Sequence, residues 1–320
     1  MKKKLISIVV PVYFEEELIG EFYSRMRAVM NGLKSRFNTE LIFINDGSKD
    51  RSLEILIGLA RRDTRVRILD LSRNFGHQRA ITAGIDHADG DAVVIIDSDL
   101  QDPPEVVPQM IEKWLEGFDV VGGTRTARKG ETVFKLVTAR LFYRLLNSLS
   151  EVPLPLDTGD FRLMDRKVVR VLRTMKEEGR YVRGLIVWAG FKQSSVLYER
   201  DARFAGETKY SFKKMLGLAL DAITSFSEKP LMIAMQLGVM ITACSFLGML
   251  YLLISRILRP ESVVAGWTSL LVVILFVGGV QIMGVGILGV YVGRIYRESR
   301  DRPLYIVQEQ YGFRKNRDGR

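Results

Sequence analysis

The chain has 320 residues, of which 47% are hydrophobic and 26% are charged. Two uncharged runs, 231–255 and 262–293, are each long enough for a helix that crosses about 30 Å of hydrocarbon. They exclude a purely soluble protein, and their small number excludes a transporter of many helices. The net charge of +10 points to nucleic acid or to an anionic membrane, and the basic residues beside the apolar runs favour the membrane.

Cysteine and histidine are scarce in this chain. The single cysteine, Cys244, lies in the first apolar run, so neither a disulfide framework nor a cysteine zinc site can form. Two histidines, His77 and His87, are too few for a histidine metal cluster. Any metal must therefore be held by oxygen ligands, which favours Mg²⁺ or Mn²⁺.

Short β-branched runs alternate with amphipathic segments from residue 5 to about residue 123. Strands are predicted at 6–12, 40–45, 66–71, 92–97 and 119–122, and helices at 15–37, 50–62, 77–88 and 104–117. Although three lysines precede the first run, Pro11 interrupts it and no cleavage site follows, so we interpret it as a buried strand rather than a signal peptide. Apolar strands separated by helices predict an α/β fold with a parallel sheet covered on both faces.

Polar side chains follow four of these strands, and ligands of such sheets bind beyond the carboxyl ends of the strands. The sharpest pattern is Asp97-Ser98-Asp99, whose two carboxylates can reach one divalent cation if the backbone turns there. A polar turn that caps the strand is the alternative. Asp46 ends the second strand in a strand-to-helix turn, and its carboxylate could also accept hydrogen bonds from a nucleobase, as could Glu15.

Six ordered motifs resemble the family-2 glycosyltransferases with the GT-A fold. They are PVYFEEE at 11–17, NDGS at 45–48, LSRNFG at 71–76, DSDLQDPP at 97–104, TGDFR at 158–162 and GETKYS at 206–211. More narrowly, the chain resembles the polyprenyl-phosphate glycosyltransferases, and its two C-terminal runs fit the bacterial bactoprenol glucosyltransferases better than the dolichyl-phosphate mannosyltransferases. It departs at His77-Gln78, where relatives often carry Lys-Glu, and we assign these two residues no role.

The resemblance implies a role for individual residues. Nucleotide contacts would come from Pro11, Tyr13, Glu15 and Asp46, whereas Mg²⁺ or Mn²⁺ and the sugar-nucleotide diphosphate would be held by Asp97, Asp99 and Gln101. Asp157 would lie near the reacting centre, with Asp99 as the second catalytic residue. The branch implies UDP-glucose as the donor and undecaprenyl phosphate as the acceptor.

Two more amphipathic helices are predicted at 131–150 and 210–228, with basic residues at their flanks. Segments that lie in a membrane interface have this pattern, although ordinary helices packed on the sheet domain share it. We expect the acceptor phosphate to be bound by Arg125, Arg128, Arg200 and Lys209. A solvated basic face attracted to anionic lipid is the alternative.

The sequence predicts three parts: a GT-A catalytic domain at 1–229, a transmembrane hairpin at 230–297 with spans at about 231–255 and 267–293, and a basic tail at 298–320. Lys and Arg are more frequent in the tail than between the spans, which places both termini in the cytoplasm and the protein in the inner (plasma) membrane. Gly279, Gly286 and Gly293 recur every seven residues and favour close helix packing, within one chain or in a homo-oligomer.

These observations predict a metal-dependent enzyme that moves one sugar, with inversion, from a nucleotide to a polyprenyl phosphate for cell-envelope glycans such as lipopolysaccharide. A processive polysaccharide synthase usually has more spans and a Q-x-x-R-W motif, which none of the three tryptophans completes. A non-catalytic nucleotide-binding membrane scaffold is a third possibility, and the intact Asp97, Asp99 and Asp157 argue against it. No nucleic-acid partner is predicted.

Overall fold

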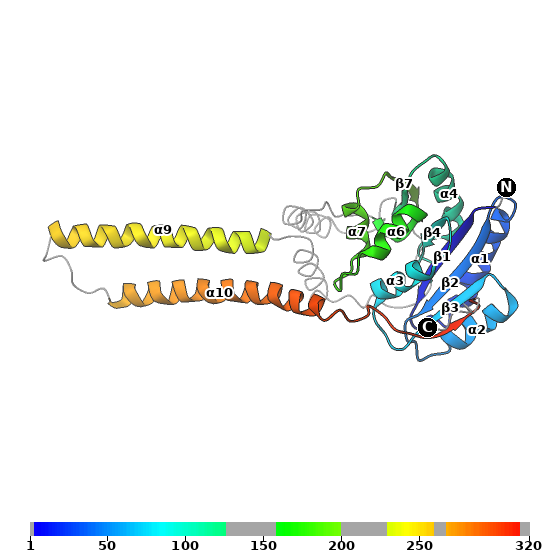
Figure 1. Ribbon diagram of the computed structural model, residues 1–320, viewed down its shortest axis with the longest axis horizontal. Coiled ribbons are helices and arrows are strands. Elements are labelled where there is room, and N and C mark those ends of the chain that lie inside the picture. The colour runs from blue at the N-terminus through cyan, green and yellow to red at the C-terminus, as the bar shows by residue number, and fades with distance from the viewer. Residues whose placement is uncertain (1–2, 126–157, 200–228, 259–266, 314–320) are drawn as a thin grey trace. The chain divides into compact units, whose positions relative to one another are not determined.

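The computed structural model describes residues 3–125, 158–199, 229–258 and 267–313 (Figure 1). The chain divides into two compact units. The first contains the described residues up to 199 together with 303–313, and the second contains the helices between 229 and 302.

The first unit is built on one eight-stranded sheet. Its strands are β1 (Leu5–Val12), β2 (Asn38–Asn45), β3 (Val66–Leu71), β4 (Ala92–Ile95), β5 (Val120–Arg125), β6 (Thr158–Asp165), β7 (Gln193–Tyr198) and β8 (Val307–Tyr311), in the order β7-β5-β6-β4-β1-β2-β3-β8. β6 and β8 run antiparallel to their neighbours, and all other neighbouring pairs are parallel. The mostly parallel α/β sheet confirms the prediction, whereas β6, β7 and β8 were not predicted.

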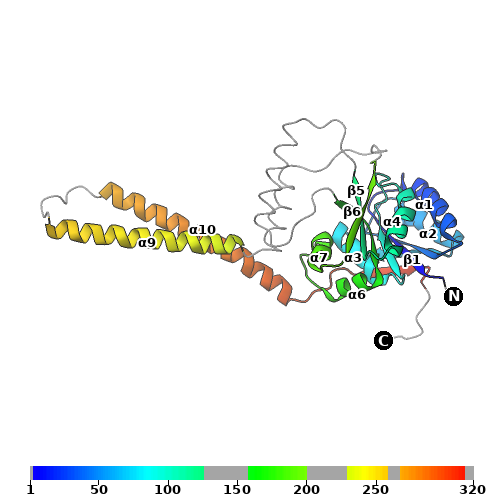
Figure 2. The same cartoon turned by 90° about the horizontal axis from the view of Figure 1, so that it is seen from above.

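Helices cover both faces of the sheet (Figure 2). One face carries α1 (Ile19–Leu33), α2 (Ser52–Arg62), the 3-10 turn η1 (Pro104–Val106) and α4 (Val107–Leu115), and the other carries α3 (His77–His87), α6 (Arg166–Thr174) and α7 (Val182–Trp188). On the first face, Phe22 and Met26 of α1 belong to one buried core with Ile8 and Phe43 of the sheet. Burial from both sides explains why β1 is apolar at every position except Ser7.

α3 lies very close to β1 and β2 because Gly84 has no side chain. A Cβ atom at Gly84 would lie 2.2 Å from Cγ1 of Val9 and 2.8 Å from Cδ1 of Ile44. The predicted helix 15–37 begins only at Ile19, since the carbonyl of Glu15 accepts the N–H groups of Leu18 and Ile19 in a turn.

The C-terminal segment predicted as a basic tail contains a strand of the sheet. β8 pairs antiparallel with β3. Just before this strand, the hydroxyl of Tyr305 donates to Asp86 at 3.0 Å. The His87 ring lies against the ring of Tyr305 and against that of Phe313, which follows the strand. Sequence analysis missed β8 because its central residues are polar and exposed, as befits an edge strand.

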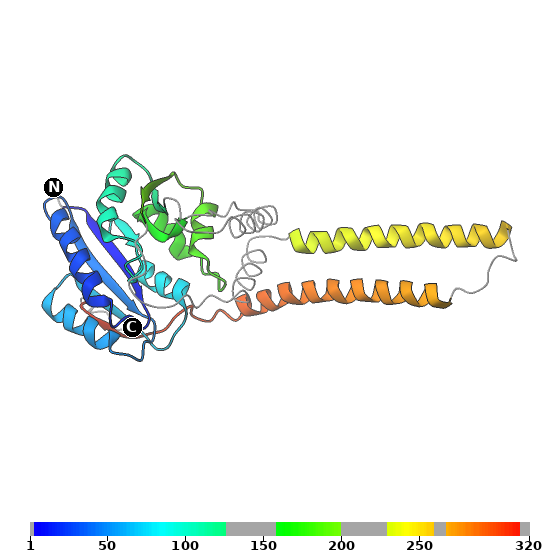
Figure 3. The same ribbon diagram turned by 180° about the vertical axis from the view of Figure 1, so that it is seen from behind.

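The second unit is a helical hairpin of α9 (Lys229–Leu258) and α10 (Trp267–Ser299), which contact one another and run antiparallel (Figures 1 and 3). The first apolar run and residues 267–293 of the second are therefore helical, as predicted. Of the described residues, one helical segment, Phe276–Ser299, is long and apolar enough to cross a membrane by length and composition. The span expected at 231–255 stays a prediction.

Candidate active site

The ends of β2 and β3 approach each other at the carboxyl edge of the sheet. Gly47 has a φ of +67°, and a Cβ there would lie 2.4 Å from the carbonyl carbon of Arg73, so only glycine fits. The buried carboxylate of Asp46 accepts the backbone N–H groups of Phe75 at 2.7 Å and Gly76 at 3.0 Å. Asp46 thus holds the loop after β3, and its contact with a nucleotide stays a prediction.

Burial raises the pKa of Asp46, although these two backbone hydrogen bonds and the positive charges nearby lower it in part. The hydrogen-bond partners of the Asp46 carboxylate are backbone groups of the protein itself. Asp46 also lies in the turn between β2 and α2, so the strand-to-helix turn considered in the sequence analysis is present. The turn also ties the second and third strands together at the point where ligands of such sheets bind.

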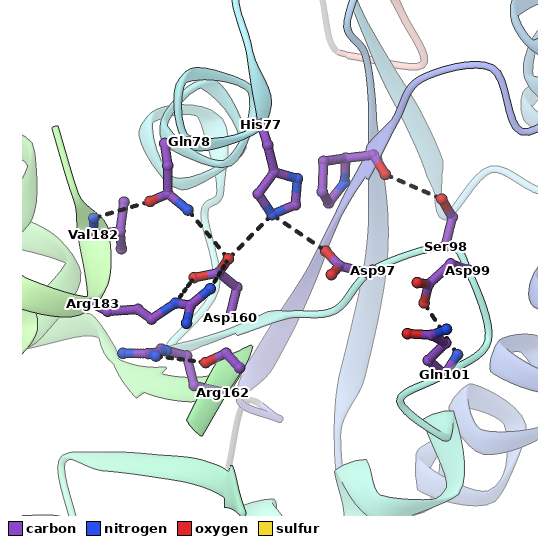
Figure 4. Close-up of polar contacts among 12 residues, drawn as sticks. His77, Gln78, Asp97, Ser98, Asp99, Gln101, Asp160, Arg162, Val182 and Arg183 are labelled. Carbon is purple, nitrogen blue, oxygen red and sulfur yellow. Dashed lines mark hydrogen bonds and ion pairs between the residues drawn. The ribbon is translucent and has the colours of Figure 1, made fainter. Parts of the chain in front are cut away.

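The residues expected to contact the nucleotide after β1 lie at this same edge. Pro11 is buried, and its carbonyl accepts the hydroxyl of Ser98 at 3.2 Å (Figure 4). The backbone N–H of Glu15 donates to Oγ of Ser52 at 3.1 Å, and Tyr13 is exposed. The structure therefore brings the end of β1 together with the ends of β2 and β4.

The backbone turns sharply after β4, as the two-carboxylate pattern requires. Leu100 has a φ of +58°, and the N–H of Gln101 donates to Oδ1 of Asp99 at 3.1 Å (Figure 4). Oδ1 of Asp97 is buried and makes no hydrogen bond within the described residues. Burial raises the pKa of Asp97 to about 6; His77 opposes this shift, and the neighbouring carboxylates reinforce it.

This turn fits a hard divalent cation. A buried carboxylate oxygen without a hydrogen bond gains from a cation beside it, and carboxylates are the ligands that Mg²⁺ and Mn²⁺ prefer. Across the described ranges, no three or more His, Cys, Asp or Glu side chains are grouped so that they could hold a metal ion. Asp97 and Asp99 would thus be two protein ligands of an ion that keeps water and substrate phosphate on its other positions.

Beside this acidic turn lies an ion cluster centred on Asp160 of β6 (Figure 4). Nε2 of His77 and Nε2 of Gln78 each lie 3.2 Å from Oδ2 of Asp160. Arg183 of α7 donates to both carboxylate oxygens, at 2.8 and 3.1 Å, and Oε1 of Gln78 accepts the N–H of Val182 at 3.0 Å. One buried carboxylate therefore joins α3, β6 and α7.

The cluster also reaches the acidic turn, because Nε2 of His77 lies 3.6 Å from Oδ1 of Asp97. Burial lowers the pKa of His77, but the hydrogen bond to Asp160 and the charges of both carboxylates outweigh it and raise this pKa to about 9. For Asp160, burial raises the pKa of the carboxyl group. Its hydrogen bonds with His77 and Arg183 outweigh burial and hold this pKa well below its usual range. At neutral pH an imidazolium therefore stands between two carboxylates.

Sequence analysis assigned no role to His77 and Gln78 and did not single out Asp160 within TGDFR. A signal was available for the histidine, since it directly follows a loop at the carboxyl edge of the sheet. The other charged members of the cluster, Asp160 and Arg183, lie on β6 and α7, two elements that were not predicted, so the cluster could not be assembled from local pattern.

Part of the expected site lies outside the described residues. This applies to Asp157, Arg128, Arg200 and Lys209 and to both predicted amphipathic helices, 131–150 and 210–228. Arg125 is the last residue of β5, and its side chain is also outside the description. The expected roles of these residues stay predictions.

Comparison with known proteins assigns the family of this sheet and its acidic edge. Residues 7–173 match the model of glycosyl transferase family 2. The chain belongs to this family. Membership in glycosyltransferase family 2 confirms the class of enzyme expected from the motifs and agrees with the GT-A fold described above.

Relatives in this family match the chain over almost its whole length. It is 54% identical to the uncharacterized glycosyltransferase YkcC of Bacillus subtilis, over 97% of this chain and 95% of that protein. It is 44% identical to the bactoprenol glucosyl transferase of Shigella phage SfV, over 95% and 98% of the two chains. Among solved structures, it is similar to glucosyl-3-phosphoglycerate synthase of Mycobacterium tuberculosis, with 21% identity, a TM-score of 0.45 and coverage of 69% and 78%.

Proposed function

We propose that the chain transfers one glucose from UDP-glucose to undecaprenyl phosphate, or to a related polyprenyl phosphate, at the cytoplasmic face of the membrane. The observation that carries this proposal is the similarity to a bactoprenol glucosyl transferase over 95% of the chain. The family-2 match ends at residue 173, so this similarity extends well beyond it into the apolar helices.

The apolar surface of the second unit supports a membrane anchor. Large side chains along both helices are exposed within the described residues, for example Tyr251 at 70% and Ile282 at 76%. So much exposed apolar surface is unfavourable in water and is typical of a membrane or protein interface. We take residues 230–297 as a two-span hairpin, with 1–229 and the tail 298–320 in the cytoplasm, and the glycines of α10 as packing sites for a homo-oligomer.

The carboxyl edge of the sheet is the proposed donor site. Pro11, Tyr13, Glu15 and Asp46 contact the nucleotide in this proposal, and Asp97, Asp99 and Gln101 hold Mg²⁺ or Mn²⁺ with the diphosphate. The buried oxygen of Asp97 that makes no hydrogen bond supports the cation. When bound, such an ion neutralises charge on the departing nucleoside diphosphate.

The proposed acceptor is a phosphate monoester whose second pKa is about 6, so it is mostly dianionic at pH 7. One of its oxygens can attack the anomeric carbon directly, and a single displacement inverts the configuration. A strong general base is not required, so Asp157 orients the acceptor or stabilises positive charge that develops on the sugar ring. Arg125, Arg128, Arg200 and Lys209 bind the acceptor phosphate in this proposal.

A donor screen tests the proposal. The purified full chain is incubated with undecaprenyl phosphate and one of UDP-glucose, UDP-galactose, UDP-N-acetylglucosamine or GDP-mannose, and both nucleotide release and the mass of the glycolipid are measured. We expect a single hexose from UDP-glucose, in β linkage. Longer products would indicate a processive synthase. The absence of turnover with every donor would indicate a non-catalytic scaffold, and an α linkage would indicate a mechanism that retains configuration.

A further inference from the structure

Two consecutive aromatic side chains stand at the surface where β1 ends. Tyr13 is 47% exposed and Phe14 is 49% exposed, whereas Phe22, Phe43 and Phe161 are buried in the core. The two exposed rings meet edge to face, with centroids 4.6 Å apart and an interplanar angle of 84°. Two large exposed rings in mutual contact indicate a binding surface more than a packing requirement.

Phe14 adopts a backbone conformation that bulky residues rarely use. Its φ is +57°, in the left-handed region that favours glycine and asparagine. Two hydrogen bonds maintain it, since the N–H of Phe14 donates to Oγ of Ser48 at 3.2 Å and the N–H of Glu15 donates to Oγ of Ser52 at 3.1 Å. Backbone strain of this kind, held in place by its surroundings, is found preferentially at functional sites.

The pair lies where a sugar nucleotide would be bound. It follows β1, which lies in the sheet between β2, the strand directly before Asp46, and β4, which leads into Asp97. The base is the flat aromatic part of a sugar nucleotide, and exposed aromatic rings bind bases by stacking. The Phe14 ring packs nearly at a right angle against the Tyr13 ring, and this contact favours the observed orientation of the tyrosine ring.

We infer that Phe14 is a positioning residue for the donor: its left-handed backbone and its ring hold Tyr13 as a stacking platform for the nucleobase. This inference rests on the proposed function, and it adds to it a residue that the motif-based assignment does not include. The strain at Phe14 is then retained because the position needs an aromatic ring, so relieving it stabilises the fold, whereas removing the ring weakens donor binding.

Three substitutions distinguish the effect of the Phe14 ring from the effect of its backbone strain. Phe14→Asn relieves the left-handed strain and removes the ring, Phe14→Leu keeps the strain and removes the ring, and Phe14→Tyr keeps both. Each full-length variant is compared with wild type by its melting temperature and by calorimetric titration with UDP and with pyrophosphate, which has no base. Trp188→Leu, at an unrelated side chain that is 64% exposed, is the matched control.

We expect Phe14→Asn to raise the melting temperature by about 2–4 °C and to lower the affinity for UDP about tenfold. Phe14→Leu should lower the affinity for UDP equally but should not raise the melting temperature. Phe14→Tyr and Trp188→Leu should behave as wild type. Pyrophosphate binding should be the same in all of them. In turnover, the KM for the donor should rise while kcat is retained.

Wild-type affinity for UDP in both Phe14→Asn and Phe14→Leu would overturn the inference and leave the proposed function standing. Equal losses for UDP and pyrophosphate would also overturn it, because the effect would not involve the base. If wild type bound no nucleoside diphosphate at all, the proposed function itself would fail.

Discussion

At the scale of single residues, the two aspartates after β4 have different surroundings. Asp99 accepts a backbone N–H, whereas Oδ1 of Asp97 is buried and makes no hydrogen bond within the described part of the chain. We expect Asp97→Ala and Asp99→Ala each to lower the transfer rate by about 100-fold or more, because each removes a ligand of the proposed cation, which would neutralise the leaving group. Initial rates at saturating donor with Mg²⁺ or Mn²⁺ measure this.

The matched control is Asp89→Ala, an exposed aspartate before β4, at the opposite end of that strand. Its rate should equal that of wild type. Excess chelator should abolish wild-type transfer, and added Mg²⁺ or Mn²⁺ should restore it. Full activity in chelator would refute the cation site.

His77 makes the stability of the catalytic unit depend on pH. Its pKa is raised to about 9 in the folded protein, where Asp97, Asp160 and Arg183 face it, from about 6.5 in an unfolded chain. The resulting stabilisation is fully present below about pH 6.5 and is lost as the pH rises through 9. We therefore expect the difference in melting temperature between wild type and His77→Gln, measured in chelator, to shrink between pH 6.5 and 9. A constant difference would contradict a protonated His77.

At the scale of elements, Asp160 joins α3, β6 and α7 through one carboxylate. Asp160→Asn leaves the partly buried Arg183 without its negative partner, so we expect the free energy of unfolding to fall by about 3–5 kcal/mol. Glu105→Gln, which removes the exposed ion pair with Arg25, should cost less than about 1 kcal/mol. Chemical denaturation of both variants measures the contrast, and equal costs would show that the cluster is not a structural junction.

The contact between α3 and the sheet depends on the lack of a side chain at Gly84. We expect Gly84→Ala to lower the free energy of unfolding by about 1–3 kcal/mol, because its methyl group would overlap Val9. Gly58→Ala in α2 is the control: no atom outside the surrounding backbone of its own helix lies within 4 Å of the added carbon, and stability should rise by about 0.5–1 kcal/mol.

A second substitution tests whether the overlap is the cause. Val9→Ala should recover part of the loss when it is combined with Gly84→Ala, since it removes the atoms that the new methyl group meets. Additive losses in the double variant would mean that Gly84→Ala acts in some other way.

At the scale of the whole molecule, the single cysteine allows the membrane topology to be measured. In a Cys244→Ser background, a membrane-impermeant maleimide should label the Ser262→Cys protein in intact cells, because the loop between the two proposed spans has few positive charges. The Asp301→Cys protein should be labelled only after the membrane is opened. The reverse pattern would invert the topology, and labelling of both proteins in intact cells would refute the two-span hairpin.

Local patterns in the sequence were enough to predict the central strands, the enzyme family and the acidic turn. β1 to β4 are largely buried, so each is rich in apolar residues and can be recognised without knowing its neighbours, although polar residues such as Glu40 and Asp70 interrupt the runs. The carboxylates of Asp97 and Asp99 are two residues apart, so a local pattern was enough to place them together. The helices α9 and α10 were equally clear, because each contains a long uncharged apolar run.

Only the tertiary structure decided which residues surround that turn. His77 meets Asp160 across 83 positions of the chain, because the antiparallel β6 enters the sheet between β4 and β5. β8 joins the edge of β3 although its residues are mostly polar. The left-handed Phe14 depends on serines more than 30 positions away. Such contacts follow from strand order and from packing between distant segments, and neither is encoded in the local periodicity from which strands and helices are predicted.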